Sequence, residues 1–142
     1  RAFENADCKP QDISLWDMHA TGTPGDWNEL CLIEEFAPKN AHISARKGLF
    51  GHGMAVCGGW ELTAQVLGMK KLPEGAFELY PTGIEPKKVN PKIRSLNRKL
   101  LLDKSVIVKP ENKEMICGKL NMGVGGVSSC VITKVTNHGK NH

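Results

Sequence analysis

The fold class is decided by the stretch I-S-L-W-D-M-H-A-T-G-T-P-G-D-W-N-E-L-C-L-I-E-E-F, residues 13–36. Its first six residues alternate apolar and polar side chains, which predicts a strand over residues 13–18. A loop rich in glycine, threonine and proline follows. Asp26 and, three residues later, Glu29 resemble a capping box, so we expect a helix from Asp26 to about Phe36. A strand that leads directly into a helix is typical of α/β folds.

The rest of the chain extends this pattern. We expect a strand over residues 41–45, a loop over 46–51, a helix over 52–69, an irregular segment over 70–97, and strands over 100–102, 105–108, 115–120 and 128–135. The expected helix contains Gly58 and Gly59, which cost about 1 kcal/mol each against alanine, so we expect another backbone to pack on them. The alternation of strands and helices, followed by a run of strands, predicts the α/β class.

Length and composition allow one packed domain or one half of a larger pseudo-symmetric domain. Of the 142 residues, 40% are hydrophobic, so we expect a core rather than global disorder. The five cysteines are odd in number and lack CxxC spacing, which argues against a disulfide framework or a zinc site. No stretch approaches the ~20 apolar residues of a membrane span. We recognise no signal peptide, and the start at Arg1 indicates a cleavage point or truncation.

Positive charge is concentrated between Lys87 and Lys113, in a chain of net charge +4. A solvated loop face and a docking surface for an acidic partner both fit this pattern. Nucleic acid fits less well, because aromatic side chains are not interleaved with the basic ones and no nucleic-acid-binding motif is present.

Three polar clusters stand at expected strand ends or helix starts. His19 leaves an apolar strand for a loop, which is where α/β folds commonly bind ligands. His52 opens the expected helix, where the positive end of the helix dipole favours a neutral imidazole able to donate to an oxyanion. Each residue also has a simpler explanation: His19 as a histidine hydrogen-bonded by neighbouring backbone groups, His52 as a helix-capping histidine, and Lys47 as a surface lysine. The glycine-rich residues 123–126 do not form GxGxxG and precede a strand, which excludes a dinucleotide-binding loop.

Together and in this order, the clusters resemble the β-ketoacyl-[acyl carrier protein] synthases. The family's His-Gly-Thr-x-Thr-Pro motif, with a downstream Asp and Glu, is matched by His19, Thr21, Thr23, Pro24, Asp26 and Glu29. Its Ser-x-x-Lys-x-x-x-Gly-His motif and a later glutamate are matched by Ser44, Lys47, Gly51, His52 and Glu61. Its closing glycine loop is matched by Gly123, Gly125 and Gly126. The resemblance extends over about residues 2–134.

The resemblance implies a thiolase-like α/β fold, of which this chain is the C-terminal half. In that half a mixed sheet is packed between helices, and the fold is incomplete without the N-terminal half. Residues 1–136 would form the β-ketoacyl synthase C-terminal domain, and residues 137–142 a disordered tail.

The resemblance also implies a reaction, the decarboxylative Claisen condensation of an acyl thioester with malonyl-acyl carrier protein in fatty acid or polyketide biosynthesis. His19 and His52 would bind the malonyl thioester carbonyl and stabilise the enolate, and Lys47 would orient them while paired with Glu61. Supporting and substrate-binding roles would fall to Asp26, Glu29, Thr21, Thr23, Met122, Gly123 and Val124. The two threonines would contact the phosphopantetheine arm.

The implied partner is an acyl carrier protein, whose phosphopantetheine carries the substrate, and no further cofactor or metal is implied. The family's nucleophilic cysteine belongs to the N-terminal half, and no cysteine here stands in its motif. We therefore expect an N-terminal ketosynthase half or a second subunit to supply it, in a cytoplasmic dimer of complete units. No nucleic-acid or membrane partner is expected.

Departures from the family keep alternatives open. Met122 and Val124 stand where the family usually has phenylalanines, which predicts a reshaped acyl pocket or a relative that does not condense. A catalytically silent partner, like a chain-length factor, is the main alternative, although it would not need both histidines. A thiolase or hydroxymethylglutaryl-type relative fits less well, because neither Cys117 nor Cys130 stands in a Cys-x-Gly context.

Overall fold

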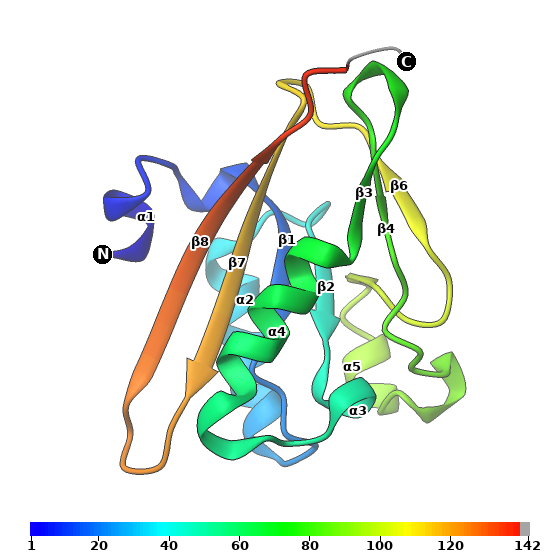
Figure 1. Cartoon of the computed structure of the whole chain (residues 1–142). Coiled ribbons are helices and arrows are strands. Elements are labelled where there is room, and N and C mark those ends of the chain that lie inside the picture. Colours follow the sequence, from blue (N-terminus) through cyan, green and yellow to red (C-terminus); the bar gives the residue numbers. More distant parts are fainter. Residues whose placement is uncertain (140–142) are drawn as a thin grey trace.

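The computed structural model describes residues 1–139 and forms an α/β arrangement of two sheets with helices (Figure 1). The α-helices are α1 Ala2–Asn5, α2 Gly25–Phe36, α3 Lys47–Phe50, α4 Cys57–Leu67 and α5 Pro91–Arg94. Four short 3-10 turns are η1 Pro10–Asp12, η2 Met54–Val56, η3 Pro73–Gly75 and η4 Pro86–Lys88. The strands are β1 Ile13–Met18, β2 His42–Ala45, β3 Met69–Lys71, β4 Phe77–Leu79, β5 Lys99–Leu100, β6 Val106–Val108, β7 Glu114–Met122 and β8 Ser128–Thr136.

The larger sheet is mixed and has the strand order β5-β2-β1-β7-β8. Its central strand β1 pairs in parallel with both β2 and β7, β2 pairs in parallel with β5, and β7 and β8 form an antiparallel hairpin. The smaller sheet, β3-β4-β6, is antiparallel. Since β1 is paired on both edges and all but one of its residues are buried, it forms the centre of the fold.

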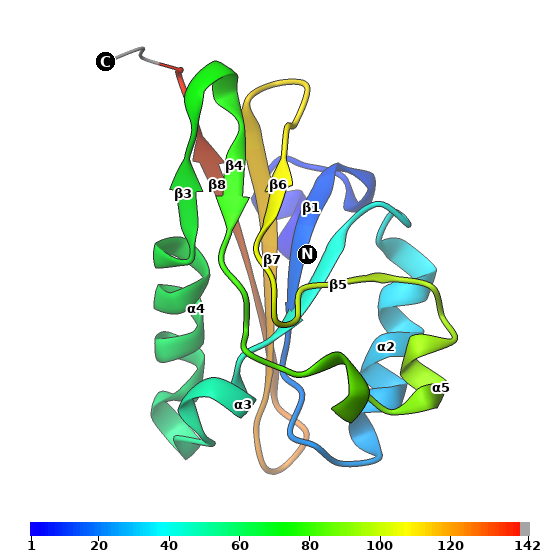
Figure 2. The same cartoon turned by 90° about the vertical axis from the view of Figure 1, so that its right-hand side faces the viewer.

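The larger sheet is covered on both faces (Figure 2). On one face, Trp16 and Met18 pack with Leu30 and Ile33 of α2. On the other face, Leu15 and its neighbours on β7 pack against the smaller sheet, and α4 lies beside them. From Leu15 onward the strand alternates with the period of two, so Leu15 and Asp17 face α4 and the smaller sheet, and Trp16 and Met18 face α2. Ile13 packs on the α2 face as well, because the register shifts between Ile13 and Leu15.

Several predictions of secondary structure are confirmed. The strand at Ile13–Met18, the helix that ends at Phe36 and the final hairpin lie where the sequence places them. The prediction of an irregular segment over 70–97 is wrong in part, because the segment contains β4 and most of β3. Each of these strands has only three residues, which is too short to show a clear period in the sequence.

The expected helix start at His52 is wrong. The helix α4 begins at Cys57, because Gly51 and Met54 adopt φ values of 78° and 48° that interrupt a right-handed helix. The residues expected to be a loop over 46–51 instead contain the single turn α3. His52 thus lies in the link between α3 and α4, and the argument from a helix dipole does not apply to it.

The expected disordered tail is also corrected where the structure describes it. Asn137 is buried, and its side-chain amide donates to the backbone oxygens of Leu72 and Ala76, at 2.8 and 2.7 Å. These bonds fasten the end of β8 to the turn between β3 and β4. The prediction for residues 140–142 lies outside the described residues. Within residues 1–139, no helix combines the length and apolarity that crossing a membrane requires.

Two glycines provide a matched test of this packing. A Cβ at Gly118 would lie 2.2 Å from two ring atoms of Trp16, which is held between Phe3 and Phe36, whereas a Cβ at Gly59 would meet nothing within 4 Å. We expect Gly118→Ala to destabilise the protein by about 1–3 kcal/mol through overpacking. Gly59→Ala should stabilise it by up to about 1 kcal/mol through helix propensity. Urea denaturation measures both changes, and equal effects would contradict the packing described.

Candidate active site

The carboxyl ends of three neighbouring strands bring the predicted residues together. Met18, the last residue of β1, pairs with Ala45 of the parallel strand β2, so His19 and the Arg46–Lys47 pair leave the sheet at the same edge. The strand β7 runs parallel to β1 and ends beside the same edge. The helix α4 packs against β7 and contributes Glu61, whose carboxylate contacts Lys47 and Lys119.

His19 is held from two sides. The backbone N–H of Met122 donates to its Nδ1 at 3.2 Å, and the ammonium of Lys47 lies 3.3 Å from the same atom and also donates to the His19 carbonyl oxygen. A backbone N–H can only donate, so Nδ1 is an acceptor and the proton of the neutral ring is on Nε2. Burial, followed by the charges of Lys47 and Lys119, lowers the pKa of His19, which favours this neutral form at pH 7.

His52 presents the same tautomer from the opposite side of the site. The N–H of Met54 donates to its Nδ1 at 3.2 Å, which leaves Nε2–H free to donate outward. Its ring is 6.0 Å from that of His19 between centroids, with an interplanar angle of 86°. Two residues 33 positions apart in sequence thus place their imidazoles side by side.

Behind the histidines, Glu61 is shared by two buried lysines. Its Oε1 lies 2.8 Å from the ammonium of Lys47, and its Oε2 lies 2.6 Å from that of Lys119. Burial alone would raise the pKa of Glu61, but the hydrogen bonds from Lys119 and Lys47 outweigh it and lower the pKa. Glu61 is therefore ionised, and the Lys47–Glu61 pair that the resemblance implies is present.

A row of polar side chains crosses the sheet beneath this pair. Asp17 of β1 is in register with Ser44 of β2 and with Lys119 of β7. Its carboxylate accepts from the Ser44 hydroxyl at 2.7 Å and from Arg46 Nε at 3.0 Å. Buried charges must be paired to be tolerated, and here each is paired.

Asp26 and Glu29 do not form the expected capping box. The helix α2 begins one residue earlier, at Gly25, and has no side-chain cap. Glu29 accepts from the backbone N–H groups of His19 and Ala20, at 2.7 and 3.1 Å, and Asp26 accepts from those of Thr21 and Gly22, at 2.8 and 2.9 Å. Both carboxylates turn back from α2 to shape the loop that holds His19. This loop is strained at Ala20, whose φ is 29°.

The predicted substrate-binding residues lie around the histidines to different degrees. Met122 contacts His19 through its N–H, and Gly123 closes the β7–β8 turn with a bond to Val127 O. Val124 is 96% exposed at the tip of that turn and lines neither of the two cavities described below. The hydroxyls of Thr21 and Thr23 lie 3.0 Å apart, and Thr23 is on the surface.

Sequence reasoning missed Asp17, Arg46 and Lys119. Asp17 and Lys119 did carry a signal, because each is a charged residue on the core-facing side of an otherwise apolar strand. Arg46 carried none, since it stands in a segment expected to be a loop.

Burial disfavours the thiolate form at three of the five cysteines. Burial raises the pKa of Cys117 to about 12 and also raises the pKa of Cys130 and of Cys8. Cys57 is buried in α4, where its thiol lies 3.6 Å from Glu61. A thiolate is the reactive form, so Cys8, Cys117 and Cys130 are poorly suited to acyl transfer.

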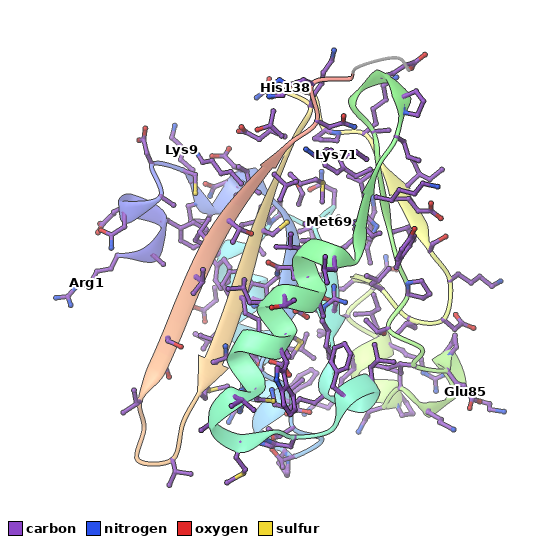
Figure 3. The ribbon with its side chains drawn as sticks, viewed as in Figure 1. Arg1, Lys9, Met69, Lys71, Glu85 and His138 are labelled. Carbon is purple, nitrogen blue, oxygen red and sulfur yellow. The ribbon has the colours of Figure 1, made fainter. Side chains whose placement is uncertain are left out.

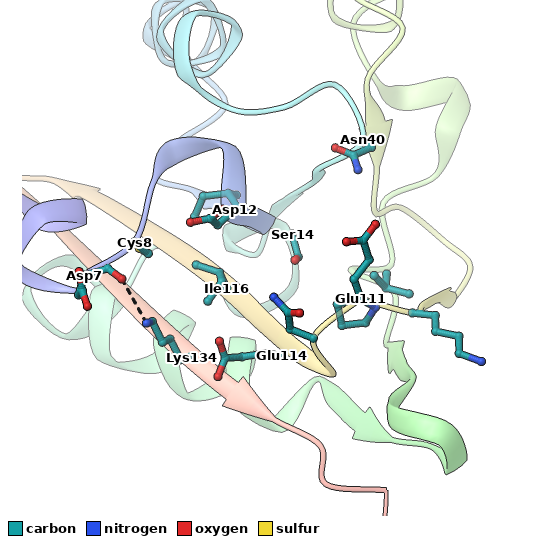
Figure 4. Close-up of a pocket in the computed structure, with 14 residues that line it drawn as sticks. Asp7, Cys8, Asp12, Ser14, Asn40, Glu111, Glu114, Ile116 and Lys134 are labelled. Carbon is teal, nitrogen blue, oxygen red and sulfur yellow. Dashed lines mark hydrogen bonds between the residues drawn. The ribbon is translucent and has the colours of Figure 1, made fainter.

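Two cavities lie outside the cluster of histidines. One of about 990 Å³, between α2, β2 and the segment 84–93, reaches Thr23 and Asp26 but neither histidine. Another of about 470 Å³ is lined by Asp7, Asp12, Glu111, Glu114 and Lys134, among others (Figure 4). It borders Ile13 and Ser14, at the opposite end of β1 from His19. Over residues 1–139, no group of three or more His, Cys, Asp or Glu side chains is arranged to hold a metal ion.

Glu29 offers a test of how the His19 loop is held. Glu29→Ala leaves the N–H groups of His19 and Ala20 without their acceptor, so we expect a loss of about 1–3 kcal/mol in the free energy of unfolding. Glu35→Ala, an exposed position on the same helix, should change it by less than about 0.5 kcal/mol. Denaturant titration of both variants checks this, and similar losses would refute the assigned contacts.

Comparison with known proteins identifies the family of this chain. The family described as Beta-ketoacyl synthase, C-terminal domain, matches residues 1–73. The polyketide biosynthesis malonyl-ACP decarboxylase PksF of Bacillus subtilis (strain 168) is 29% identical over 132 residues, which cover 92% of this chain and 28% of that protein. The 3-oxoacyl-[acyl-carrier-protein] synthase 2 of Staphylococcus aureus is 33% identical over 73 residues, 49% of this chain and 18% of that protein.

A solved structure gives the same fold. The oxazolomycin ketosynthase domain OzmH KS7 of Streptomyces albus JA3453 superimposes with a TM-score of 0.70 and 21% identity, over 95% of this chain and 25% of that one. The chain therefore spans less than a third of the length of each of these relatives. The chain belongs to the β-ketoacyl synthase family and has the thiolase-like fold of its C-terminal portion.

Proposed function

We propose that this chain supplies the decarboxylating residues of a β-ketoacyl synthase, which condenses an acyl thioester with malonyl-acyl carrier protein. The observation that carries the proposal is the shared tautomer of the two histidines. Both rings accept a backbone N–H at Nδ1, so each neutral ring has its N–H donor at Nε2, and the rings lie 6.0 Å apart between centroids.

In the proposed step, the thioester oxygen of the malonyl group accepts from both Nε2–H groups. The bond between the carboxylate and the methylene carbon breaks, CO₂ leaves, and its electron pair forms an enolate whose negative charge develops on that oxygen. Donors placed in advance where charge develops stabilise the transition state more than the ground state. The enolate carbon then attacks the acyl thioester and releases its thiolate.

Lys47 acts electrostatically in this proposal. Its ammonium is buried and bonded to Glu61 and to the His19 carbonyl, so no free amine is present for nucleophilic attack. Its charge next to Nδ1 opposes protonation of His19 and favours the developing enolate. Glu61 fixes Lys47 in this position.

The condensation step needs residues from outside the chain. The attacked acyl group would be held on a cysteine of an N-terminal ketosynthase half or a second subunit, because the buried thiols of this chain are poorly suited to carry it. Exposed apolar side chains beside the histidines would pack against that half, among them Met54 and Trp60. An acyl carrier protein would deliver malonate on phosphopantetheine, with Thr21 and Thr23 at the arm and the basic segment 87–113 as a docking surface. Complete units would form cytoplasmic dimers.

A second candidate is decarboxylation without condensation. One relative is named a malonyl-ACP decarboxylase, and Met122 and Val124 replace the phenylalanines usual in condensing members. A catalytically silent partner is less well supported, because such a chain would not require both Nε2–H donors. Measuring CO₂ and the β-ketoacyl product in one assay separates these possibilities: CO₂ with product indicates a synthase, CO₂ alone a decarboxylase, and neither a silent partner.

The main test is His52→Ala in the protein that joins this chain with a cysteine-bearing ketosynthase portion. Loss of one donor to the enolate oxygen should slow CO₂ release from malonyl-acyl carrier protein by roughly 100- to 1,000-fold. His138→Ala is the control, since His138 is exposed and lies at the end of the sheet away from α3 (Figure 3). Undiminished CO₂ release in His52→Ala would remove the proposed mechanism.

The glycine loop makes a separate prediction about chain length. If Val124 leaves space in the acyl pocket of the complete protein, Val124→Phe should shorten the acyl chains that it accepts. Mass spectrometry of the products from acyl donors of increasing length measures the shift. An unchanged length profile, with wild-type CO₂ release, would show that Val124 does not border the pocket.

A further inference from the structure

Lys119 lies at the centre of the buried charges, although no motif includes it. It stands in the middle of β7, is 1% exposed, and donates to the backbone oxygen of Met18 at 2.8 Å. Met18 immediately precedes His19, so this bond fixes the backbone from which the first histidine departs. The same ammonium binds Glu61 at 2.6 Å.

One carboxylate needs only one cation, and Glu61 already has Lys47. The second lysine therefore requires a reason of its own. Burial raises the pKa of Asp17 and of Glu29, and the charge of Lys119 opposes that rise in both. Lys119 is thus the cation that acts on all three buried carboxylates of the site.

The charge balance shows what this cation does. The buried charged side chains around the end of β1 are Asp17, Glu29, Arg46, Lys47, Glu61 and Lys119, which are three anions and three cations. With all three carboxylates ionised, their sum is zero only while Lys119 is present. Without it the group has a net charge of −1 next to His19, and a buried negative charge favours the imidazolium.

We propose that Lys119 is a positioning residue of the decarboxylation site. It holds Met18 and Glu61 in place and balances the buried carboxylates, so that His19 remains a neutral Nε2–H donor. The inference rests on the proposed function for its catalytic meaning, but the charge balance itself does not depend on the reaction.

The charged groups that act on His19 come from three elements. Lys47 comes from α3, Lys119 from β7 and Glu61 from α4. The two lysines lower the pKa of His19, after the larger effect of burial, and Glu61 raises it. Removal of Lys119 and removal of the Glu61 charge should therefore shift this pKa in opposite directions.

The first experiment needs no substrate. In the protein that joins this chain with its cysteine-bearing portion, NMR titration of labelled histidine follows His19, assigned by the loss of its signal in His19→Gln. We expect Lys119→Met to raise the pKa of His19, Glu61→Gln to lower it, and Lys119→Arg, which keeps the charge, to leave it close to wild type. Lys134→Met, on the exposed side of the neighbouring strand β8, should change nothing.

These variants separate positioning from general damage. Loss of structure would expose His19 and move its pKa toward the ordinary value in every variant, whereas the proposal requires opposite shifts. If Lys119→Met does not fold, the contrast between Glu61→Gln and Lys119→Arg still tests the charge balance. A His19 pKa unchanged in Lys119→Met, or raised in Glu61→Gln, would overturn the inference.

The second experiment measures CO₂ release against pH in the same variants. A higher pKa of His19 converts the donor to imidazolium at higher pH, so the acid limb of the profile should move upward in Lys119→Met and return in Lys119→Arg. If His52→Ala retained full CO₂ release, the proposed function would fail while the NMR result stood. If the acid limb and the His19 signal both stayed in place in Lys119→Met, the role of Lys119 would fail while the proposed function stood.

Discussion

The buried contact of Glu61 with Lys47 and Lys119 is the constraint on which the rest of the site depends. It joins α4, α3 and β7 at the edge where β1 ends. Breaking a buried ion pair by removing one partner typically costs about 3–5 kcal/mol, because the remaining charge is left uncompensated. The three elements are therefore not free to move independently, and the histidines that they support keep a fixed separation.

The order of the strands makes this contact possible. With β1 between β2 and β7, and all three parallel, their carboxyl ends meet at one edge, and each contributes a polar residue to the same row. The face of β1 that is turned toward α4 changes along the strand from the apolar Leu15 to the charged Asp17 and then to His19. The apolar core and the polar site thus lie on the same face of β1, one after the other along the strand. The packing of the core therefore holds the site residues in position.

Backbone groups do as much as side chains in preparing the imidazoles. The N–H groups of Met122 and Met54 select the tautomer, and the carboxylates of Asp26 and Glu29 hold the N–H groups of the His19 loop. Ala20 lies in a left-handed conformation within this loop, at the glycine position of the His-Gly-Thr-x-Thr-Pro motif that this segment resembles. Such strain persists only where surrounding hydrogen bonds hold the conformation in place. Here Glu29 does so, because its carboxylate accepts from the N–H of Ala20.

The sequence by itself determined the α/β class, the central strand, the final hairpin and the identities of His19, Lys47 and His52 as one set. These features depend on the hydrophobic periodicity of single elements and on motifs of fixed spacing, both of which are visible in the sequence itself. Only the tertiary structure decided the start of α4, the partners of Asp26 and Glu29, and the place of Lys119. The helix start depends on positive φ values at Gly51 and Met54, and Lys119 meets Met18 from 101 residues away. Contacts of that range leave no period in the sequence, because they arise when separate strands are brought to one edge.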